Sequence, residues 1–330
     1  MIKKTQKNFL SSGNLFLDKI TGGISLGTVV LLIEDNPSTM YESFIKYFMA
    51  EGIVNQQKCF FYNSSNSNIA KNLPYKSTQV ESILNAKRVN DTKEMKIAWR
   101  YENIQYSNLL DDILKSTDYI FDLSRELQDI YLTDKNKGML IEKIIQSESD
   151  NTLDEINLNI IKDYQDYASG LSEEEVKHCR FVIPNLFQND DVKDISKLKV
   201  NLNILKNLAR SVNGIIYISI NKEFMESKVY NIIEYFSDYV FEIKSFIIDP
   251  QRLEDYDGLF YIRKLPRICT LKLRDLETDT YGLIVEKRKI VIEKIDIGVE
   301  VDRNTKVKEK DITASQAICG QEKYSKNYEF

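Results

Sequence analysis

The residues with the clearest chemical meaning occupy positions 34–39, directly after a hydrophobic segment. A loop that binds nucleoside triphosphates wraps the phosphates with glycine amides, and it adds a Lys for the phosphates and a Ser or Thr for Mg²⁺. This segment contains neither glycine nor lysine, and its proline removes one amide donor. Two acids stand where the negative triphosphate would lie. We therefore predict a degenerate phosphate-binding position without nucleotide hydrolysis, formed by Glu34, Asp35, Asn36, Pro37, Ser38 and Thr39.

The elements that must position this loop are those of a nucleotide-binding unit. Thr28–Glu34 is short and rich in aliphatic and β-branched residues, which favours a buried parallel strand. A helical pattern then runs up to Gly52, with Thr39 and Glu42 in the spacing of a capping box. Cys59–Tyr62 predicts the next strand. A right-handed β-loop-α-β crossover therefore places the loop at the carboxyl end of the first strand.

Charge is distributed unevenly along the chain. The 330 residues carry a net charge of −5, yet residues 102–179 hold 18 Asp and Glu against 7 Lys and Arg. The rest of the chain therefore carries a positive excess. A solvated acidic insertion accounts for this pattern, and so does a basic body that faces a polyanion. Within the insertion, Leu109–Leu114 and Met139–Ile145 have helical patterns, Glu148–Glu155 is a polar break, and we expect loose packing.

Composition excludes several classes of protein. A hydrophobic content of 42% and a charged content of 29% are typical of globular proteins. The first twelve residues lack the apolar core of a signal peptide, and Val29–Ile33 is too short to span a bilayer. Four scattered cysteines indicate a reduced intracellular protein, expected in the cytoplasm with the nucleus as a second location. His178 beside Cys179 is typical of a structural pair, so we predict no metal and no cofactor.

Several short motifs are similar to those of a known family. Residues 11–28 hold a Ser-Gly step, a Leu-Asp pair, a Gly-Gly pair and Leu-Gly-Thr, an arrangement that resembles the entrance to RecA-like ATPase domains. Met95–Tyr101, which contains the only Trp, and Phe121–Arg125 resemble motifs of the family of fourth subunits of the Elongator complex. The resemblance covers most of the chain outside residues 126–178. It implies an α/β fold of RecA-like, P-loop NTPase type, with a mostly parallel sheet flanked by helices.

The order of elements agrees with that expectation. In a RecA-like sheet the strand predicted at Arg180–Asn185 would end in an acid that holds Mg²⁺, but this chain has Asn185 there, and Asp190 and Asp191 come later. The nucleotide motifs are therefore degenerate at two positions. An amphipathic pattern at 195–212 predicts a long helix. From Gly258, short strands predict a C-terminal antiparallel meander at one sheet edge, at 259–263, 270–273, 281–286 and 289–295.

The expected domain organisation is simple. We predict one RecA-like domain at residues 1–300, which includes the acidic insertion at about 102–179. Residues 301–330 are predicted to form a charged, partly disordered C-terminal tail.

The resemblance also implies a function. Proteins of that family are accessory subunits without catalysis of their own, and they form a hetero-hexameric ring with the fifth and sixth Elongator subunits. The ring binds tRNA and supports modification of the wobble uridine (U34) by the catalytic subcomplex. The residues leave two alternatives open: an ATPase whose site is completed by a neighbouring subunit, and a scaffold that never contacts nucleic acid.

Two basic clusters are the candidates for contact with tRNA. Both lie at or near strand ends of the predicted meander, where side chains can reach outward, and arginine can bind two phosphate oxygens at once. The alternative is that these side chains pair with nearby acids such as Asp255, Asp257 and Glu286. The candidate tRNA-binding residues are Arg263, Lys264, Arg267, Lys287, Arg288 and Lys289.

Overall fold

The structure is a computed structural model. Met1–Ile295 forms one compact unit and Asp296–Phe330 a second, and every described residue belongs to the first. The domain boundaries expected from the sequence stay a prediction. The structure describes residues 9–35, 38–63, 68–79, 118–127, 139–145, 152–170, 178–187, 192, 194–247, 255–266, 276 and 278–295, with the backbone alone at Phe224.

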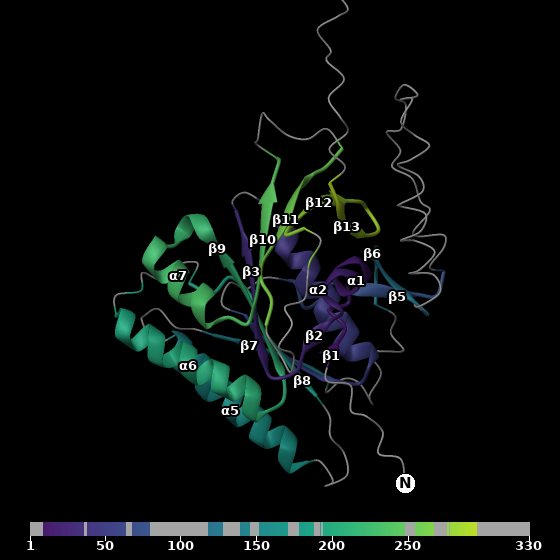
Figure 1. The fold of residues 1–330 in the computed structure, drawn as a ribbon. Coiled ribbons are helices and arrows are strands. Elements are labelled where there is room, and N and C mark those ends of the chain that lie inside the picture. Colours follow the sequence, from purple (N-terminus) through teal and green to yellow (C-terminus); the bar gives the residue numbers. More distant parts are fainter. Residues whose placement is uncertain are drawn as a thin grey trace, which may run out of the picture. The chain divides into compact units, whose positions relative to one another are not determined.

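A nine-stranded sheet runs through the described part of the chain (Figure 1), in the order β13-β12-β11-β10-β3-β9-β8-β4-β7. The strands from β10 to β7 pair in parallel. All seven residues of β3 are buried, as expected for a parallel strand with both faces covered. These strands are β3 (Thr28–Glu34), β4 (Lys58–Asn63), β7 (Leu140–Ile144), β8 (Cys179–Ile183), β9 (Ile215–Asn221) and β10 (Tyr239–Ser245).

Three antiparallel strands extend the sheet beyond β10. They are β11 (Gly258–Lys264), β12 (Thr280–Val285) and β13 (Ile290–Lys294), and each pairs with the preceding strand. The predicted α/β fold, with a mostly parallel sheet and an antiparallel meander at one edge, is therefore confirmed. The strand expected at 270–273 lies outside the described residues.

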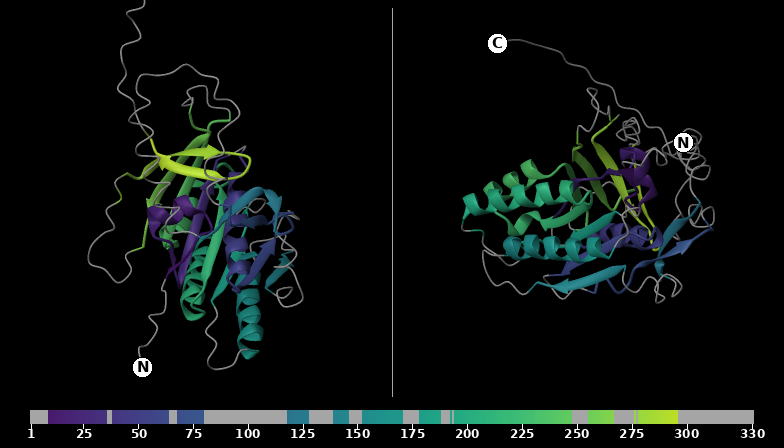
Figure 2. Two further views of the ribbon diagram at one scale, coloured as in Figure 1. Left: turned by 90° about the vertical axis from the view of Figure 1, so that its right-hand side faces the viewer. Right: turned by 90° about the horizontal axis from the view of Figure 1, so that it is seen from below.

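Helices cover both faces of the sheet (Figure 2). On one face, α1 (Leu15–Thr21) and α2 (Met40–Val54) pack with inward side chains of β3 such as Val30 and Leu32. On the other face lie α5 (Thr152–Ser169), α6 (Ile195–Ser211) and α7 (Ser227–Phe236). Alternate residues of β3 thus enter two separate hydrophobic layers, because successive side chains of a strand point to opposite faces.

Two predictions about the acidic insertion are wrong. Met139–Ile145 is not helical: Leu140–Ile144 is strand β7, which pairs in parallel with β4 at the edge of the sheet. The segment is too short for an independent helix, and a free sheet edge supplies the hydrogen bonds. The packing of α5 is also not loose, because Leu153, Ile156 and Ile160 enter the same hydrophobic layer as α6.

Short elements connect these layers. The pair β1 (Phe9–Leu10) and β2 (Ile24–Ser25) lies beside α1, and the 3₁₀ turn η2 (Lys222–Phe224) follows β9. A second two-stranded sheet joins β5 (Pro74–Ser77) to β6 (Ile120–Glu126). The main-chain amide of Leu123 in β6 donates to the carbonyl oxygen of Arg288, at 2.8 Å, so this small sheet is attached to the turn between β12 and β13.

Candidate functional site

The Glu34 side chain occupies the position at which a phosphate would be expected. Glu34 is the last residue of β3, and its carboxylate turns back over the start of α2. It accepts hydrogen bonds from the main-chain amides of Met40, at 2.8 Å, and Tyr41, at 3.4 Å, and from the hydroxyl of Ser38. Amides at the first turn of a helix lack partners within the helix and attract anions. Here a side chain of the same chain supplies the anion.

The capping box expected at α2 is wrong. Thr39 is the N-cap residue, but its side chain makes no capping hydrogen bond, and only its carbonyl oxygen accepts from the amide of Glu42, at 3.2 Å. Glu42 instead lies 3.7 Å from Lys46, one turn along the helix. The carboxylate of Glu34 binds the amides that a capping side chain would satisfy, which explains why Thr39 is not needed for this purpose.

Burial controls the ionisation of Glu34. Only 3% of the residue is exposed. Burial raises the pKa of Glu34 to about 7, against the lowering effect of the Ser38, Met40 and Tyr41 donors. The negative charge of Asp35 raises it further. The carboxyl group therefore changes its protonation state near neutral pH, within a site that contains no basic donor among the described contacts.

Asp35 is held by a different element. Its carboxylate accepts from the main-chain amide of Ser245 at the end of β10, at 2.9 Å, and burial raises its pKa. The two acids thus diverge, one toward α2 and one toward β10. Of the six residues in the predicted degenerate position, Glu34, Asp35, Ser38 and Thr39 are described, whereas Asn36 and Pro37 lie outside the described residues.

The second altered position lies beside the first. Asn185 follows β8 in a left-handed conformation, with a φ angle of 47°. Its side-chain amide donates to the hydroxyl of Tyr41, at 2.6 Å, and its main-chain amide donates to the hydroxyl of Ser219, at 2.8 Å. Burial raises the pKa of Tyr41 to about 12, so this phenol stays protonated. Asp190 and Asp191 lie outside the described residues.

Together these contacts fill the place of a nucleotide with protein groups. The amides of α2 are bound to Glu34, and the amide of Asn185 is bound to Tyr41. An incoming triphosphate would have to displace a carboxylate from a helix N-terminus and would gain no lysine in return among the described residues. That these residues are a lost nucleotide site stays a prediction, and the contacts give it a physical basis.

Replacing Glu34 with Gln is expected to change how stability depends on pH. The folded chain binds this proton more tightly than the unfolded chain, with a pKa of about 7 against 4.5. Wild-type stability is thus greatest below pH 4.5 and falls, by up to about 1 kcal/mol per pH unit, as pH rises through 7. Glu34→Gln keeps an acceptor for the amides and should remove this slope. Urea unfolding from pH 5 to 8 measures it.

The matched control for this prediction is Glu226→Gln, which makes the same change at an exposed residue. It should unfold with the wild-type pH slope. Equal slopes in the wild type and Glu34→Gln would show that Glu34 has an ordinary pKa in the folded chain.

The first basic cluster is partly engaged in contacts within the chain. Arg263 forms an ion pair with Glu242 of β10. The ammonium of Lys264 donates to the carbonyl oxygens of Tyr235, at 2.8 Å, and Glu234, at 3.3 Å, at the end of α7. Arg267 lies outside the described residues. Arg263 and Lys264 also line a cleft with two cations of α6, Lys206 and Arg210, which the sequence did not connect with them.

The second basic cluster is divided by its surroundings. Lys287 is exposed, whereas Lys289 is only 1% exposed and lies 3.3 Å from Glu286. Burial lowers the pKa of Lys289, and the Glu286 charge opposes this shift. Arg288 binds the buried carboxylate of Asp122 in β6 through two nitrogens, at 2.9 and 2.7 Å. Pairing with acids, the alternative left open above, thus occurs here, although tRNA contact by these residues stays a prediction.

The described residues offer no site for a metal. They contain no group of three or more His, Cys, Asp or Glu that could hold one. No helix in the described ranges is long and apolar enough to cross a membrane. Of the motifs that carry the family resemblance, Phe121–Arg125 lies in β6, whereas Met95–Tyr101 lies outside the described residues.

Comparisons with known proteins agree with this architecture. A model of the PAXNEB protein family matches residues 3–330. The chain is 28% identical to Elongator complex protein 4 of Dictyostelium discoideum over 348 residues, which cover 91% of this chain and 77% of that protein. It is 25% identical to the mouse (Mus musculus) protein of the same name, covering 94% and 82%.

A solved structure is similar in fold. It is the ATPase domain of a RecA-like helicase, which matches with a TM-score of 0.51 and 14% sequence identity, over 89% of this chain and 95% of that one. At this level of identity the likeness supports the fold alone, and it confirms the RecA-like class.

Proposed function

This chain belongs to the PAXNEB protein family, and on that basis we propose that it acts as the fourth, non-catalytic subunit of an Elongator complex. In this proposal it joins the fifth and sixth subunits in a hetero-hexameric ring in the cytoplasm. The ring binds tRNA and supports modification of the wobble uridine by the catalytic subunits. The relatives named Elongator complex protein 4, matched along more than 90% of this chain, support the assignment.

The position of Glu34 is the observation that carries the non-catalytic part of the proposal. A nucleotide-hydrolysing RecA-like subunit must leave the amides of its phosphate-binding loop open to the ligand. In this chain the amides of Met40 and Tyr41 are bound to the Glu34 carboxylate. The fold is retained while the ligand position is filled from within, as expected of a subunit kept for assembly rather than for turnover.

The ring itself fits the properties of the fold. A closed ring of RecA-like domains uses head-to-tail contacts, so each subunit presents two different surfaces to its neighbours. We propose that this chain associates in this manner with the fifth and sixth subunits, and that the alternating order of subunits closes the ring. A composite ATPase, completed by a neighbour, would still need phosphate to displace Glu34.

Co-expression of the full chain with the fifth and sixth subunits of its own organism is expected to yield a complex of ring size. Native mass spectrometry should give two copies of each subunit, and filter binding should detect tRNA on the complex. Wild-type and Glu34→Gln complexes should turn over Mg-ATP at equal rates, because the proposal gives Glu34 no catalytic role.

The control is the fifth and sixth subunits expressed without this chain, which should form no particle of that mass. A monomer that ignores both subunits would contradict assembly, and a ring without affinity for tRNA would leave a scaffold. A complex whose ATP turnover depends on Glu34 would be an enzyme that uses this site, against the proposal.

A further inference from the structure

A cleft of about 760 Å³ lies at the opposite end of the parallel strands from Glu34. Thr28, the first residue of β3, forms part of its wall, and Asp238 directly precedes β10. Since β3 is seven residues long, the cleft is about 20 Å from the filled nucleotide position. The lining residues are Leu26, Gly27, Thr28, Lys206, Arg210, Asn213, Asp238, Arg263, Lys264, Leu265 and Pro266.

The charge of the cleft is strongly positive. Its wall contains four cations and a single acid, Asp238. That acid is already engaged: Lys206 lies 2.8 Å from it, and the amide of Val29 donates to it at 3.0 Å. Burial lowers the pKa of Lys264, and the nearby charge of Lys206 lowers it further, so the cations are close enough to repel one another. An anionic ligand would relieve this repulsion.

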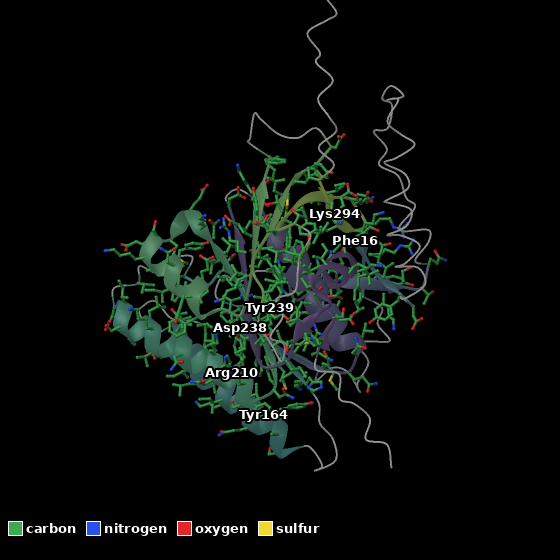
Figure 3. The ribbon with its side chains drawn as sticks, in the orientation of Figure 1. Phe16, Tyr164, Arg210, Asp238, Tyr239 and Lys294 are labelled. Atoms are coloured by element: carbon green, nitrogen blue, oxygen red, sulfur yellow. The ribbon has the colours of Figure 1, made fainter. Side chains whose placement is uncertain are left out.

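Arg210 is the cation with the most freedom to bind a ligand. It is exposed in the last turn of α6, and within the described part of the chain its guanidinium makes no ion pair or hydrogen bond. Figure 3 labels Arg210 on α6 and Asp238 at the start of β10. The three other cations each keep a contact: Lys206 with Asp238, Lys264 with main-chain carbonyls and Arg263 with Glu242.

The backbone around Arg210 is fixed. A Cβ atom at Gly27, where φ is 73°, would lie 3.4 Å from the Cα atom of Arg210, so the end of α6 packs closely on the turn before β3. The amide of Gly27 also donates to the carbonyl oxygen of Gly214, at 2.8 Å. A rigid backbone beneath a free guanidinium limits the entropy lost when a ligand is bound.

The composition of the cleft favours phosphate over carboxylate groups. Two arginines supply planar forks that each match two oxygens of a phosphate, and two lysines add point charges. We propose that this cleft binds the phosphodiester backbone of RNA, a site that rests on the proposed function, in which the complex binds tRNA. Such contacts read no bases, so binding should depend on salt and not on sequence.

Replacing Arg210 with Glu tests this site, with Lys199→Glu as a matched control. Lys199 is exposed on the same helix, eleven residues earlier, and so lies on the same face about 16 Å away and outside the cleft. Both changes alter the net charge equally. Affinity for tRNA is measured on the full complex and on the full chain, from 50 to 300 mM salt.

Arg210→Glu should lower the slope of log affinity against log salt by about 0.8, the value of one phosphate contact, with about sixfold weaker binding at 0.1 M salt. Lys199→Glu should keep the wild-type slope. Equal losses in both variants would mean attraction by net charge, and unchanged affinity in both would remove the site. Either result overturns the inference but leaves the proposed function in place, whereas a wild-type complex that binds no tRNA overturns both.

A structural role for Arg210 gives a different result. A cation in the last turn of a helix stabilises its carbonyl end, and its reversal would lower the melting temperature without changing the salt slope of a folded variant. Arg210→Gln, which removes the charge without reversing it, should still lower the slope. Loss of ring assembly by these variants, seen in native mass spectra, would assign the cleft to a protein contact and overturn the inference.

Discussion

Gly52→Val is expected to destabilise the folded chain by roughly 3 kcal/mol or more. Gly52 lies in the last turn of α2, where a Cβ atom would come within 2.4 Å of the sulfur of Cys59 and 2.7 Å of the Cδ atom of Arg180. Both neighbours are almost completely buried. Neither can move aside, because the Arg180 guanidinium donates to the side chain of Gln57, at 2.6 Å, and to the carbonyl oxygen of Phe48, at 3.0 Å.

Urea unfolding of the purified chain measures this effect, and Gly170→Val is the matched control. A Cβ atom at Gly170 would meet only the Tyr167 carbonyl oxygen, at an ordinary 3.6 Å, so the control should change stability by about 0.5 kcal/mol or less. If the two variants unfold at the same urea concentration, the close packing of α2 on Arg180 is wrong.

Asp122→Ala should lower the free energy of unfolding by roughly 3 kcal/mol, because it leaves the guanidinium of Arg288 without its partner. Asp122 is 1% exposed and joins β6 to the turn between β12 and β13. Burial alone would raise the pKa of this acid, but hydrogen bonds from Arg288 and Ser124 hold it below its ordinary value. Stability from this pair is therefore present at neutral pH and is lost as pH falls through the lowered pKa.

The control is Asp154→Ala, which breaks an ion pair with Lys197 at a similar 2.7 Å, but between side chains that are 40% and 36% exposed. An exposed pair contributes between 0 and about 1 kcal/mol, so this variant should unfold near the wild type. Thermal melts at pH 7 compare the two. If Asp122→Ala melts with the control, Arg288 is free to serve another role, such as the contact with tRNA expected from the sequence.

Much of the fold follows from local sequence patterns. The β-loop-α-β unit around Glu34 was predictable because burial on both faces requires continuous aliphatic strands, and the helix period is visible in α2 and α6. The strand at Leu140–Ile144 was not, because its residues allow either element and only pairing with β4 selects the strand. Element type is set locally where a pattern is long, and by distant partners where it is short.

The chemistry of the sites depends on distant contacts that no local pattern contains. The sequence located Glu34 and Asn185 as departures from a working nucleotide site, but not the bonds that Glu34 makes with α2. The pair of Asp122 and Arg288 spans 166 positions. The basic cleft likewise joins Arg210 on α6 to Arg263 on β11, through the order of strands in the sheet. Only the sequence signal of exposed basic residues pointed toward it.

The Glu34 carboxylate has a consequence for how the subunit responds to metabolism. In a loop that must be ordered by a nucleotide, the occupied fraction follows the concentration of that nucleotide by mass action. Here the occupying anion is tethered four to seven residues from its donors, so its effective concentration is set by the chain and not by the cell. The start of α2 should therefore keep the same conformation whether ATP is abundant or exhausted.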